Sequence, residues 1–223
     1  MKSLWLHSKN RNKLIIFCNG WGMDERPFTP LASVQYDVLM LYDYTDLSTD
    51  MDVGKLLAGY PEVSLIAWSM GVWAGNQIFS SRQKKFHVAL ALNGTLAPIH
   101  DDFGILIKIA SATLENFHEK QRLKFYYRMC NDRDLYKTFV ANQPGRSIAG
   151  QKEELASLLQ STTRAVTHSS ASVYTNVVVA RHDYIIPTVN QLQFWPQKNV
   201  RLVDGSHFLF YAYSSWDELL VAF

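Results

Sequence analysis

One stretch, residues 63–75, restricts the possible fold of this chain more than any other, because a buried strand there runs directly into a helix. Its sequence is VSLIAWSMGVWAG, and the apolar run ends at Ser69 without ordinary turn residues before the helical pattern begins. A nucleophile elbow holds a serine on such a strained turn, and the residues two before and two after that serine must be small. Ala67 and Gly71 occupy those positions. We therefore predict that Ser69 is a catalytic nucleophile; the alternative is a serine that only caps the helix.

Around this stretch, short apolar runs alternate with helical patterns, which is typical of a mostly parallel sheet with crossover helices. The predicted strands cover residues 13–18, 36–42, 63–68, 86–92, 173–180 and 200–203. Shorter helices are predicted at residues 50–57, 187–195 and 214–220. Between residues 98 and 167 the alternation stops, and the clearest helices there cover residues 113–129 and 147–164. We predict a single α/β domain whose core is formed by residues 1–97 and 168–223, with a helical lid inserted at residues 98–167.

The composition argues against several classes of function. A formal net charge of +2 is too small to indicate a nucleic-acid-binding protein. The chain has 2 cysteines, and Cys18 lies inside a strand-like apolar run, which indicates a reduced core residue. The apolar run at the start is too short for a signal peptide, and no later run approaches the length of a membrane span. We expect a soluble, monomeric cytoplasmic protein that binds neither nucleic acid nor a membrane.

Two further polar residues follow late strands and complete a possible triad. Asp183 comes shortly after the strand predicted to end at residue 180, and His207 lies in a turn after the last strand. The chain order Ser, Asp, His is the order that a nucleophile elbow of this kind requires. Asp204 is the rival acid, but it is so close to His207 in sequence that it has little freedom to reach the imidazole from behind. His182 is the rival base, and we interpret it as a surface or pocket-edge residue.

Stabilisation of a developing oxyanion requires backbone amides that are already oriented toward it. One normally follows the nucleophile and the other comes from an early strand-to-helix loop, which points to Met70 and Trp21. Trp21 lies in the segment Asn19-Gly20-Trp21-Gly22, directly after the first predicted strand. A tight turn built on two glycines is the alternative interpretation.

The other histidines show no metal-ligand spacing, so no metal site is predicted. A serine triad with two amides supplies nucleophile, base and electrophilic stabilisation by itself. We therefore expect the reaction to need neither a metal nor a cofactor.

These motifs resemble those of the α/β-hydrolase superfamily. They are Asn19-Gly20-Trp21-Gly22-Met23, Ala67-Trp68-Ser69-Met70-Gly71, Arg181-His182-Asp183 with Pro187, and Gly205-Ser206-His207-Phe208. By length and motif order the whole chain is more closely similar to the BioG type of pimeloyl-[acyl-carrier protein] methyl ester esterase of biotin synthesis. The resemblance implies removal of a methyl ester from a pimeloyl chain held on acyl-carrier protein, with a triad of Ser69, Asp183 and His207. Ala67, where the commoner pattern has glycine, is a mild departure.

The lid sequence is compatible with an acidic carrier protein as partner. A local excess of basic residues includes Lys120, Arg122, Lys124 and Arg128. Such a cluster can attract an acidic protein, although a solvated helix face would have the same composition. Two other functions use the same motifs: a general short-chain esterase, lipase or thioesterase, and a non-catalytic binding protein of the hydrolase fold. The second is disfavoured because no triad position is lost.

Overall fold

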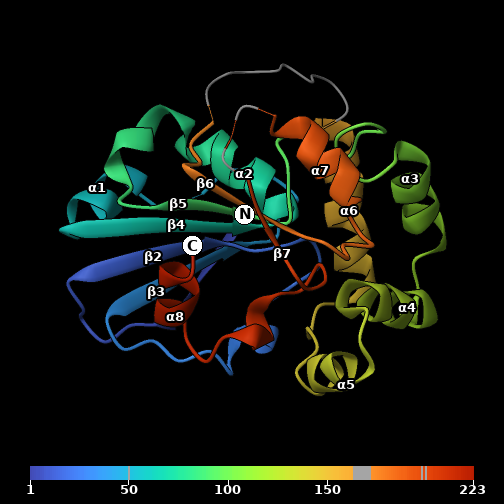
Figure 1. Ribbon diagram of the computed structural model, residues 1–223, viewed down its shortest axis with the longest axis horizontal. Helices are drawn as coiled ribbons and strands as arrows, with labels where there is room; N and C mark the ends of the chain where they lie inside the picture. Colours follow the sequence, from blue (N-terminus) through green and yellow to red (C-terminus); the bar gives the residue numbers. More distant parts are fainter. Residues whose placement is uncertain (50, 163–171, 197, 199) are drawn as a thin grey trace.

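A computed structural model of the chain describes residues 1–49, 51–162, 172–196, 198 and 200–223 (Figure 1). Its strands form one 7-stranded sheet in the order β1-β3-β2-β4-β5-β6-β7. β1 pairs antiparallel with β3, and the other neighbouring strands are parallel. The strands are β1 (Lys2–His7), β2 (Lys13–Cys18), β3 (Tyr36–Tyr42), β4 (Glu62–Trp68), β5 (Ala89–Leu92), β6 (Asn176–Ala180) and β7 (Val200–Val203).

The strand predictions hold best where the strand is an apolar run inside the sheet. β2, β3 and β7 have the predicted bounds, and β4 begins one residue early, whereas β5 and β6 begin later than predicted, at Ala89 and Asn176. β1 was not predicted, because it lies at the sheet edge and most of its residues are exposed, which leaves no buried pattern in the sequence. The mostly parallel sheet with flanking helices confirms the predicted fold class.

The helices on the two faces of the sheet are short. They are α1 (Val53–Ala58), α2 (Met70–Phe79), α7 (Thr188–Phe194) and α8 (Trp216–Val221). In Figure 1, α2 lies above the sheet and α8 below it. Single turns of 3-10 helix occur at Arg26–Phe28 and Phe210–Ala212, and a longer 3-10 segment follows α2.

Four helices lie between β5 and β6 in the chain: α3 (Ile107–Asn116), α4 (Glu119–Cys130), α5 (Arg133–Ala141) and α6 (Ile148–Thr162). They gather at the right-hand end of the sheet in Figure 1. The predicted helix at residues 113–129 is wrong, because the backbone is extended at Phe117 and His118 and separates α3 from α4. The buried Phe117 ring packs 5.1 Å from the ring of Trp21, and this contact holds the break in place.

α5 was not predicted as a separate helix. Asn131 ends α4 with a left-handed φ of 48°, and the Asp132 carboxylate then accepts hydrogen bonds from the amides of Asp134 and Leu135. Asparagine is a common residue at the end of a helix, and aspartate is a favoured N-cap of the next one. The pair Asn131-Asp132 therefore indicates in the sequence that one helix ends and another begins there. The predicted lid boundary at residues 167 and 168, the end of the predicted helix at Arg164, and the predicted helix start at residue 50 lie outside the described residues.

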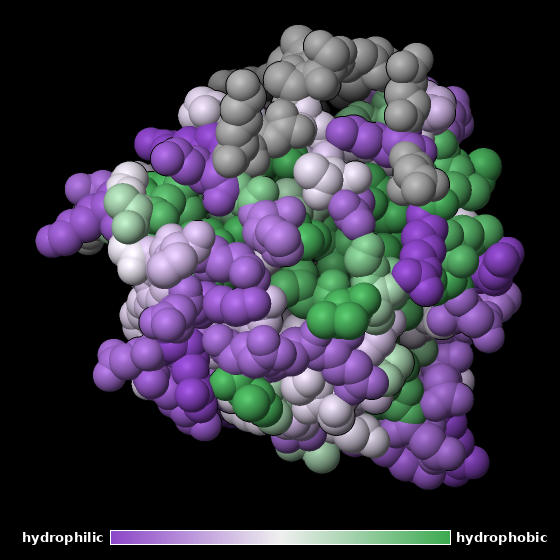
Figure 2. Space-filling view, turned by 60° about the vertical axis from the view of Figure 1, so that its left-hand side comes forward, coloured by the Kyte–Doolittle hydropathy of each residue, from purple (hydrophilic) through white to green (hydrophobic). Residues whose placement is uncertain are grey.

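The core has two layers because successive strand residues point to opposite faces of the sheet. Ile15 and Phe17 of β2 pack on one face with α8, and Leu14, Ile16 and Cys18 pack on the other with α2. Figure 2 shows a face on which hydrophilic residues cover most of the lower part and hydrophobic residues form a patch at the centre. A third cluster, which contains Trp21 and Met70, joins the inserted helices to α2 and to the loops after β2 and β3. Among the described helices, none is both long and apolar enough to cross a membrane.

Candidate active site

The turn between β4 and α2 is strained, as a nucleophile elbow requires. Ser69 has φ 57° and ψ −125°, a conformation that non-glycine residues rarely adopt. A Cβ atom on Gly71 would lie 2.2 Å from the carbonyl oxygen of Cys18 and 2.4 Å from that of Asn19. The backbone of α2 therefore passes so close to the end of β2 that only glycine fits at position 71. This close approach brings Ser69 beside the loop that follows β2.

Gly71→Ala is expected to destabilise the fold by about 3 kcal/mol, since the added methyl group would meet rigid backbone oxygens and not a movable side chain. Gly59→Ala is the matched control, because Gly59 is exposed with a φ of −76° and its new Cβ would make only ordinary contacts. It should change stability by less than about 1 kcal/mol. Urea unfolding of the two variants measures the difference, and equal midpoints would contradict the account of the elbow.

Three buried side chains meet above the elbow in hydrogen-bonding order. The Ser69 hydroxyl oxygen lies 2.9 Å from Nε2 of His207, and Nδ1 of His207 lies 2.7 Å from the Asp183 carboxylate. The three residues come from the ends of β4, β6 and β7, which a parallel sheet brings to the same edge. This is the geometry of a nucleophile, a base and an acid that orients the base.

The Asp183 carboxylate is held from several sides. Its Oδ1 atom accepts hydrogen bonds from the amides of Ile185 and Ile186 at 2.8 and 2.9 Å. Its Oδ2 atom faces His207 and also accepts from the Gln191 side chain at 2.8 Å. These donors fix the direction of the carboxylate.

The two rival residues lie elsewhere. His182 and Asp204 pair with each other at 3.3 Å, and their side chains are 56% and 88% exposed. Asp204 is therefore directed to solvent and to His182, and not to the imidazole of His207. This arrangement matches the interpretation of His182 as a surface residue.

Sequence reasoning missed the residues that hold the His207 loop. Asn93, at the end of β5, has a left-handed φ of 45°. Its side-chain amide donates to the carbonyl oxygens of Ser206 and His207 at 3.1 and 2.9 Å, and its Oδ1 accepts from the amide of Ala180 at 2.7 Å. The Trp68 indole also donates to the His207 carbonyl, at 2.9 Å. A polar Asn-Gly pair directly after an apolar strand was the available signal, since it follows the same strand-end rule as the triad.

Trp21 and Met70, whose amides are predicted to stabilise the oxyanion, line the same pocket as Ser69 and His207. Met70 is the first residue of α2, where a backbone N–H has no acceptor within the helix. Trp21 follows Gly20, where a Cβ would lie 2.8 Å from the Trp68 ring, so the loop needs a glycine to approach the elbow.

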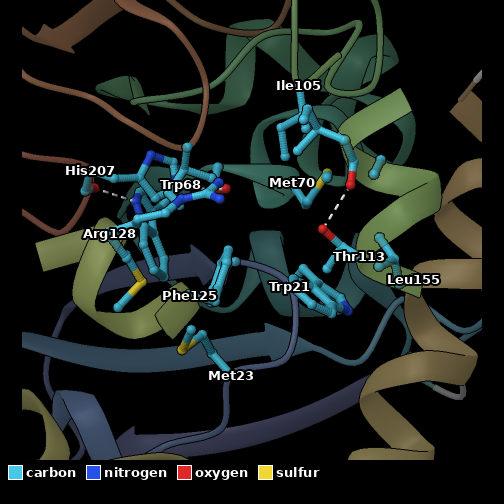
Figure 3. Close-up of a pocket in the computed structure, with 16 residues that line it drawn as sticks. Trp21, Met23, Trp68, Met70, Ile105, Thr113, Phe125, Arg128, Leu155 and His207 are labelled. Carbon is cyan, nitrogen blue, oxygen red and sulfur yellow. Dashed lines mark hydrogen bonds between the residues drawn. The ribbon is translucent and has the colours of Figure 1, made fainter. Parts of the chain in front are cut away.

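The pocket at the triad is largely apolar. Besides Ser69, His207, Thr113 and Arg128, its walls are formed mainly by apolar side chains of β4, α2, the loops after β2 and β6, and the inserted segment. In Figure 3, Met70 and Ile105 lie on one side of a central opening, with Trp21 and Met23 on the other. An acyl chain can be held by such walls, with its ester at Ser69.

A second, more open pocket adjoins the first. The two share Ile109, Thr113, Phe125 and Arg128, and the second is also lined by Lys124. The surface between α3 and α4 thus connects the triad with two exposed basic side chains. Among the described residues, no group of three or more His, Cys, Asp and Glu side chains is arranged to hold a metal ion.

The four lid cations predicted to bind a partner are not equivalent. Lys120, Lys124 and Arg128 are exposed and recur every fourth residue on α4, which places them on one face of that helix. Arg122 differs, because its side chain is only 13% exposed. Its guanidinium donates to the Arg146 carbonyl at 3.0 Å and to the Glu119 carboxylate at 2.6 Å. Arg122 therefore makes contacts within the chain, and its role in partner binding stays a prediction.

The sheet and the helices around it define the class, a protein of the α/β-hydrolase fold. A lipase-esterase related protein from Clostridium acetobutylicum matches with a TM-score of 0.66 at 13% identity, over 99% of this chain and 96% of that one, a likeness of fold. The family described as pimeloyl-ACP methyl esterase BioG matches residues 1–219. The chain belongs to this family, which confirms the resemblance seen in its motifs.

Two relatives illustrate the family match. The crystal structure of BioG from Haemophilus influenzae has a TM-score of 0.86 and 30% identity, and the match covers 97% of this chain and 98% of that one. A malonyl-[acyl-carrier protein] O-methyltransferase from Bacteroides fragilis is 33% identical over 200 residues, which are 89% of this chain. This chain spans 40% of the length of that methyltransferase.

Proposed function

We propose that this protein hydrolyses the methyl ester of pimeloyl-[acyl-carrier protein] in the cytoplasm, with Ser69 as nucleophile, His207 as general base and Asp183 as the acid that orients it. The observation that carries this proposal is the hydrogen-bonded chain from Ser69 through His207 to Asp183, with distances of 2.9 and 2.7 Å, in a member of the BioG family.

The proposed reaction has two halves. His207 takes the proton of the Ser69 hydroxyl while the Ser69 oxygen attacks the ester carbonyl carbon. The amides of Trp21 and Met70 stabilise the negative charge that develops on the former carbonyl oxygen. The tetrahedral intermediate collapses, and methanol leaves with the proton from His207. His207 then takes a proton from water, whose oxygen attacks the acyl-enzyme. The second tetrahedral intermediate collapses, His207 returns the proton to the Ser69 oxygen, and the pimeloyl carboxylate leaves, still joined to its carrier.

The substrate has two cleavable groups, a methyl ester at one end and a thioester to the carrier at the other. The apolar pocket favours the mode in which the methyl ester lies at Ser69, the alkyl chain follows the apolar walls, and the thioester extends toward α3 and α4. A general esterase or thioesterase with the same triad would lack this preference.

Product analysis separates these functions. The protein is incubated with methyl pimeloyl-carrier protein, and methanol, free carrier thiol and the mass of the carrier are followed over time. The proposal expects methanol and an intact thioester, with a specificity constant well above that for nitrophenyl esters. Release of free carrier thiol would indicate a thioesterase, and a higher constant for the nitrophenyl esters would indicate a general esterase.

We propose that the exposed face formed by Lys120, Lys124 and Arg128 on α4 docks the carrier protein. Acyl-carrier proteins are acidic, and complementary charge across exposed surfaces accelerates encounter. Lys124 and Arg128 also line the second pocket, so a carrier bound there would have its acyl arm beside the route to Ser69.

Reversal of charge at Lys124 and Arg128 to glutamate is expected to raise the KM for methyl pimeloyl-carrier protein at least tenfold. The attraction should weaken with added salt, because the Debye length is about 8 Å at physiological ionic strength. Hydrolysis of a nitrophenyl ester should change by less than about threefold, since the triad is untouched. Steady-state kinetics on the two substrates at low and moderate salt measure both effects.

The matched control reverses Lys9 and Arg11, an equal charge change on exposed residues before β2. The triad lies at the opposite, carboxyl end of the parallel strands, so this control should leave both KM values unchanged. If the α4 variant lost activity equally on the carrier substrate and on the nitrophenyl ester, the substitutions would have disturbed the structure of the lid. An unchanged KM for the carrier substrate would exclude this face as its docking surface.

A further inference from the structure

A group of charged side chains lies buried beside the active site without belonging to the triad. Glu154 on α6 is 0% exposed and pairs with Arg146 at 3.2 Å. Arg146 in turn pairs with Asp43 at 3.1 Å, and both of those side chains are nearly buried. Lys2 closes the series at the surface, 2.9 Å from Asp43.

The Glu154 carboxylate reaches the loop that contains Trp21. Its Oε2 atom accepts a hydrogen bond from the backbone N–H of Gly22 at 3.1 Å, and Oε1 accepts from the N–H of Tyr44 at 3.0 Å. Gly22 has a left-handed φ of 72°, so the chain turns sharply directly after Trp21. The bond to Gly22 therefore fixes the peptide plane that joins Trp21 to Gly22.

Other contacts from the inserted segment hold the same loop. The Trp21 indole N–H donates to the Gln151 carbonyl at 2.8 Å, and the Gln151 side-chain amide donates to the Gly22 carbonyl at 2.8 Å. Arg146 donates to the Met23 carbonyl at 3.3 Å. The lid side of the loop is thus held by α6 and the residues just before it.

Tyr44 connects the same carboxylate to the start of the loop. Its backbone N–H bonds Glu154, and its buried hydroxyl donates to the carbonyl of Asn19 at 2.9 Å. Glu154 therefore acts on the loop at Gly22 directly and at Asn19 through Tyr44. The Gly20–Trp21 peptide, which carries the N–H proposed for the oxyanion, lies between these two fixed points.

Burial of this carboxylate is costly. Loss of solvent raises the pKa of Glu154 to about 7, although Arg146 and the amides of Tyr44 and Gly22 favour the charged form. A buried ion pair is weak evidence for stability, because desolvation offsets most of the attraction. The geometry that Glu154 imposes on the loop is a better reason for its presence than any stability it adds.

We propose that Glu154 is a positioning residue for oxyanion stabilisation, which holds the loop at residues 19–22 so that the Trp21 N–H faces the developing negative charge at Ser69. The inference rests on the proposed function, in which that amide takes part. Glu154 touches no reacting atom. It acts through the peptide groups of Gly22 and Tyr44.

Glu154→Gln tests this role at constant side-chain volume. Both carboxylate oxygens accept from backbone N–H groups, but glutamine has only one acceptor oxygen, and its NH₂ group would face the other N–H as a second donor. Glu153→Gln is the matched control, since Glu153 is the exposed neighbour on the same helix. The substrate is a nitrophenyl ester, which is independent of carrier docking.

Glu154→Gln is expected to lower kcat about 100-fold, the loss typical of one oxyanion donor, with KM changed less than about threefold. Affinity for a trifluoromethyl ketone, which forms an oxyanion adduct with a catalytic serine, should fall by a similar factor. Glu153→Gln should match the wild type in all three. A merely structural role would lower the unfolding temperature and leave kcat and ketone affinity of the folded protein unchanged, and that result would overturn the proposal.

A second variant, Glu154→Asp, tests the proposal if Glu154→Gln does not fold. Glu154→Asp keeps the negative charge opposite Arg146, but its shorter side chain cannot reach both amides. It should show the same selective loss of kcat, and folded Glu154→Asp with wild-type kcat would overturn the proposal. Ser69→Ala is assayed beside these variants. If it hydrolyses the ester as fast as the wild type, the proposed nucleophile is wrong, which is distinct from failure of Glu154 alone.

Discussion

Replacement of Ser69 by alanine is expected to reduce ester hydrolysis by about 10⁴-fold or more, the scale seen when a triad nucleophile is removed. The hydroxyl is the only group of this side chain that can form the acyl-enzyme, and it lies 2.9 Å from the base. The fold should persist, because alanine removes one buried atom that makes no hydrogen bond to the core beyond His207. Steady-state kinetics and thermal unfolding of the purified variant measure both outcomes.

Labelling by a fluorophosphonate provides an independent check on Ser69. The wild type should react covalently and lose activity in step with labelling, and the alanine variant should remain unlabelled. Ser206, which is buried next to His207 in the chain, is the matched control. The Ser206→Ala variant should still be labelled by the fluorophosphonate. If the Ser69→Ala variant were labelled at the wild-type rate, the nucleophile would be a residue other than Ser69.

Asp183→Asn is expected to lower kcat by about 10⁴-fold at neutral pH, the scale of the corresponding change in serine proteases. Oδ1 of Asp183 accepts from two backbone amides, so the asparagine oxygen must take that place. The NH₂ group then points at Nδ1 of His207, which becomes an acceptor. The imidazole proton moves to Nε2, and that nitrogen can no longer receive the proton of Ser69.

The control for this change is Asp204→Asn, at the rival acid. Its carboxylate pairs with the exposed His182 and is itself exposed, so kcat should stay within about twofold of the wild type. Kinetics on the same ester and thermal unfolding compare the two variants. Equal losses would show that the acid of the triad is misassigned, and wild-type kcat in Asp183→Asn would exclude the proposed role of this residue.

The parts of the fold that could be predicted from the sequence are those coded by local patterns. β2 and β3 are apolar runs inside the sheet, and their bounds were predicted from those runs alone. β1 could not be predicted in this way, because pairing with β3 and not burial holds it at the edge. The break between α3 and α4 depends on the contact of Phe117 with Trp21, which joins positions distant in the chain.

The site shows the same division. Ser69, Asp183 and His207 each follow a strand, and their chain order predicts a triad; the structure brings the three side chains into hydrogen-bonding contact. Glu154 carried no such signal, although Leu155 and Leu158 beside it follow the helical period of buried residues on α6. A glutamate on the buried side of a helix cannot be interpreted without its partners, and these come from loops far away in sequence. The catalytic roles, the monomeric state and the lid boundaries remain predictions.

One consequence of α6 concerns redesign of the enzyme for other acyl chains. Leu155 lines the pocket at Ser69, and its neighbour in sequence, Glu154, accepts a hydrogen bond from Gly22 in the loop after β2. Any substitution that shifts α6 to enlarge the pocket would also move the amide of Gly22. Ile109 and Thr113 on α3 line the same pocket. The Thr113 hydroxyl donates to the Ile109 carbonyl within the helix and not to that loop. Variation of chain-length preference should therefore start from α3, where the shape of the pocket can change while the loop after β2 stays in place.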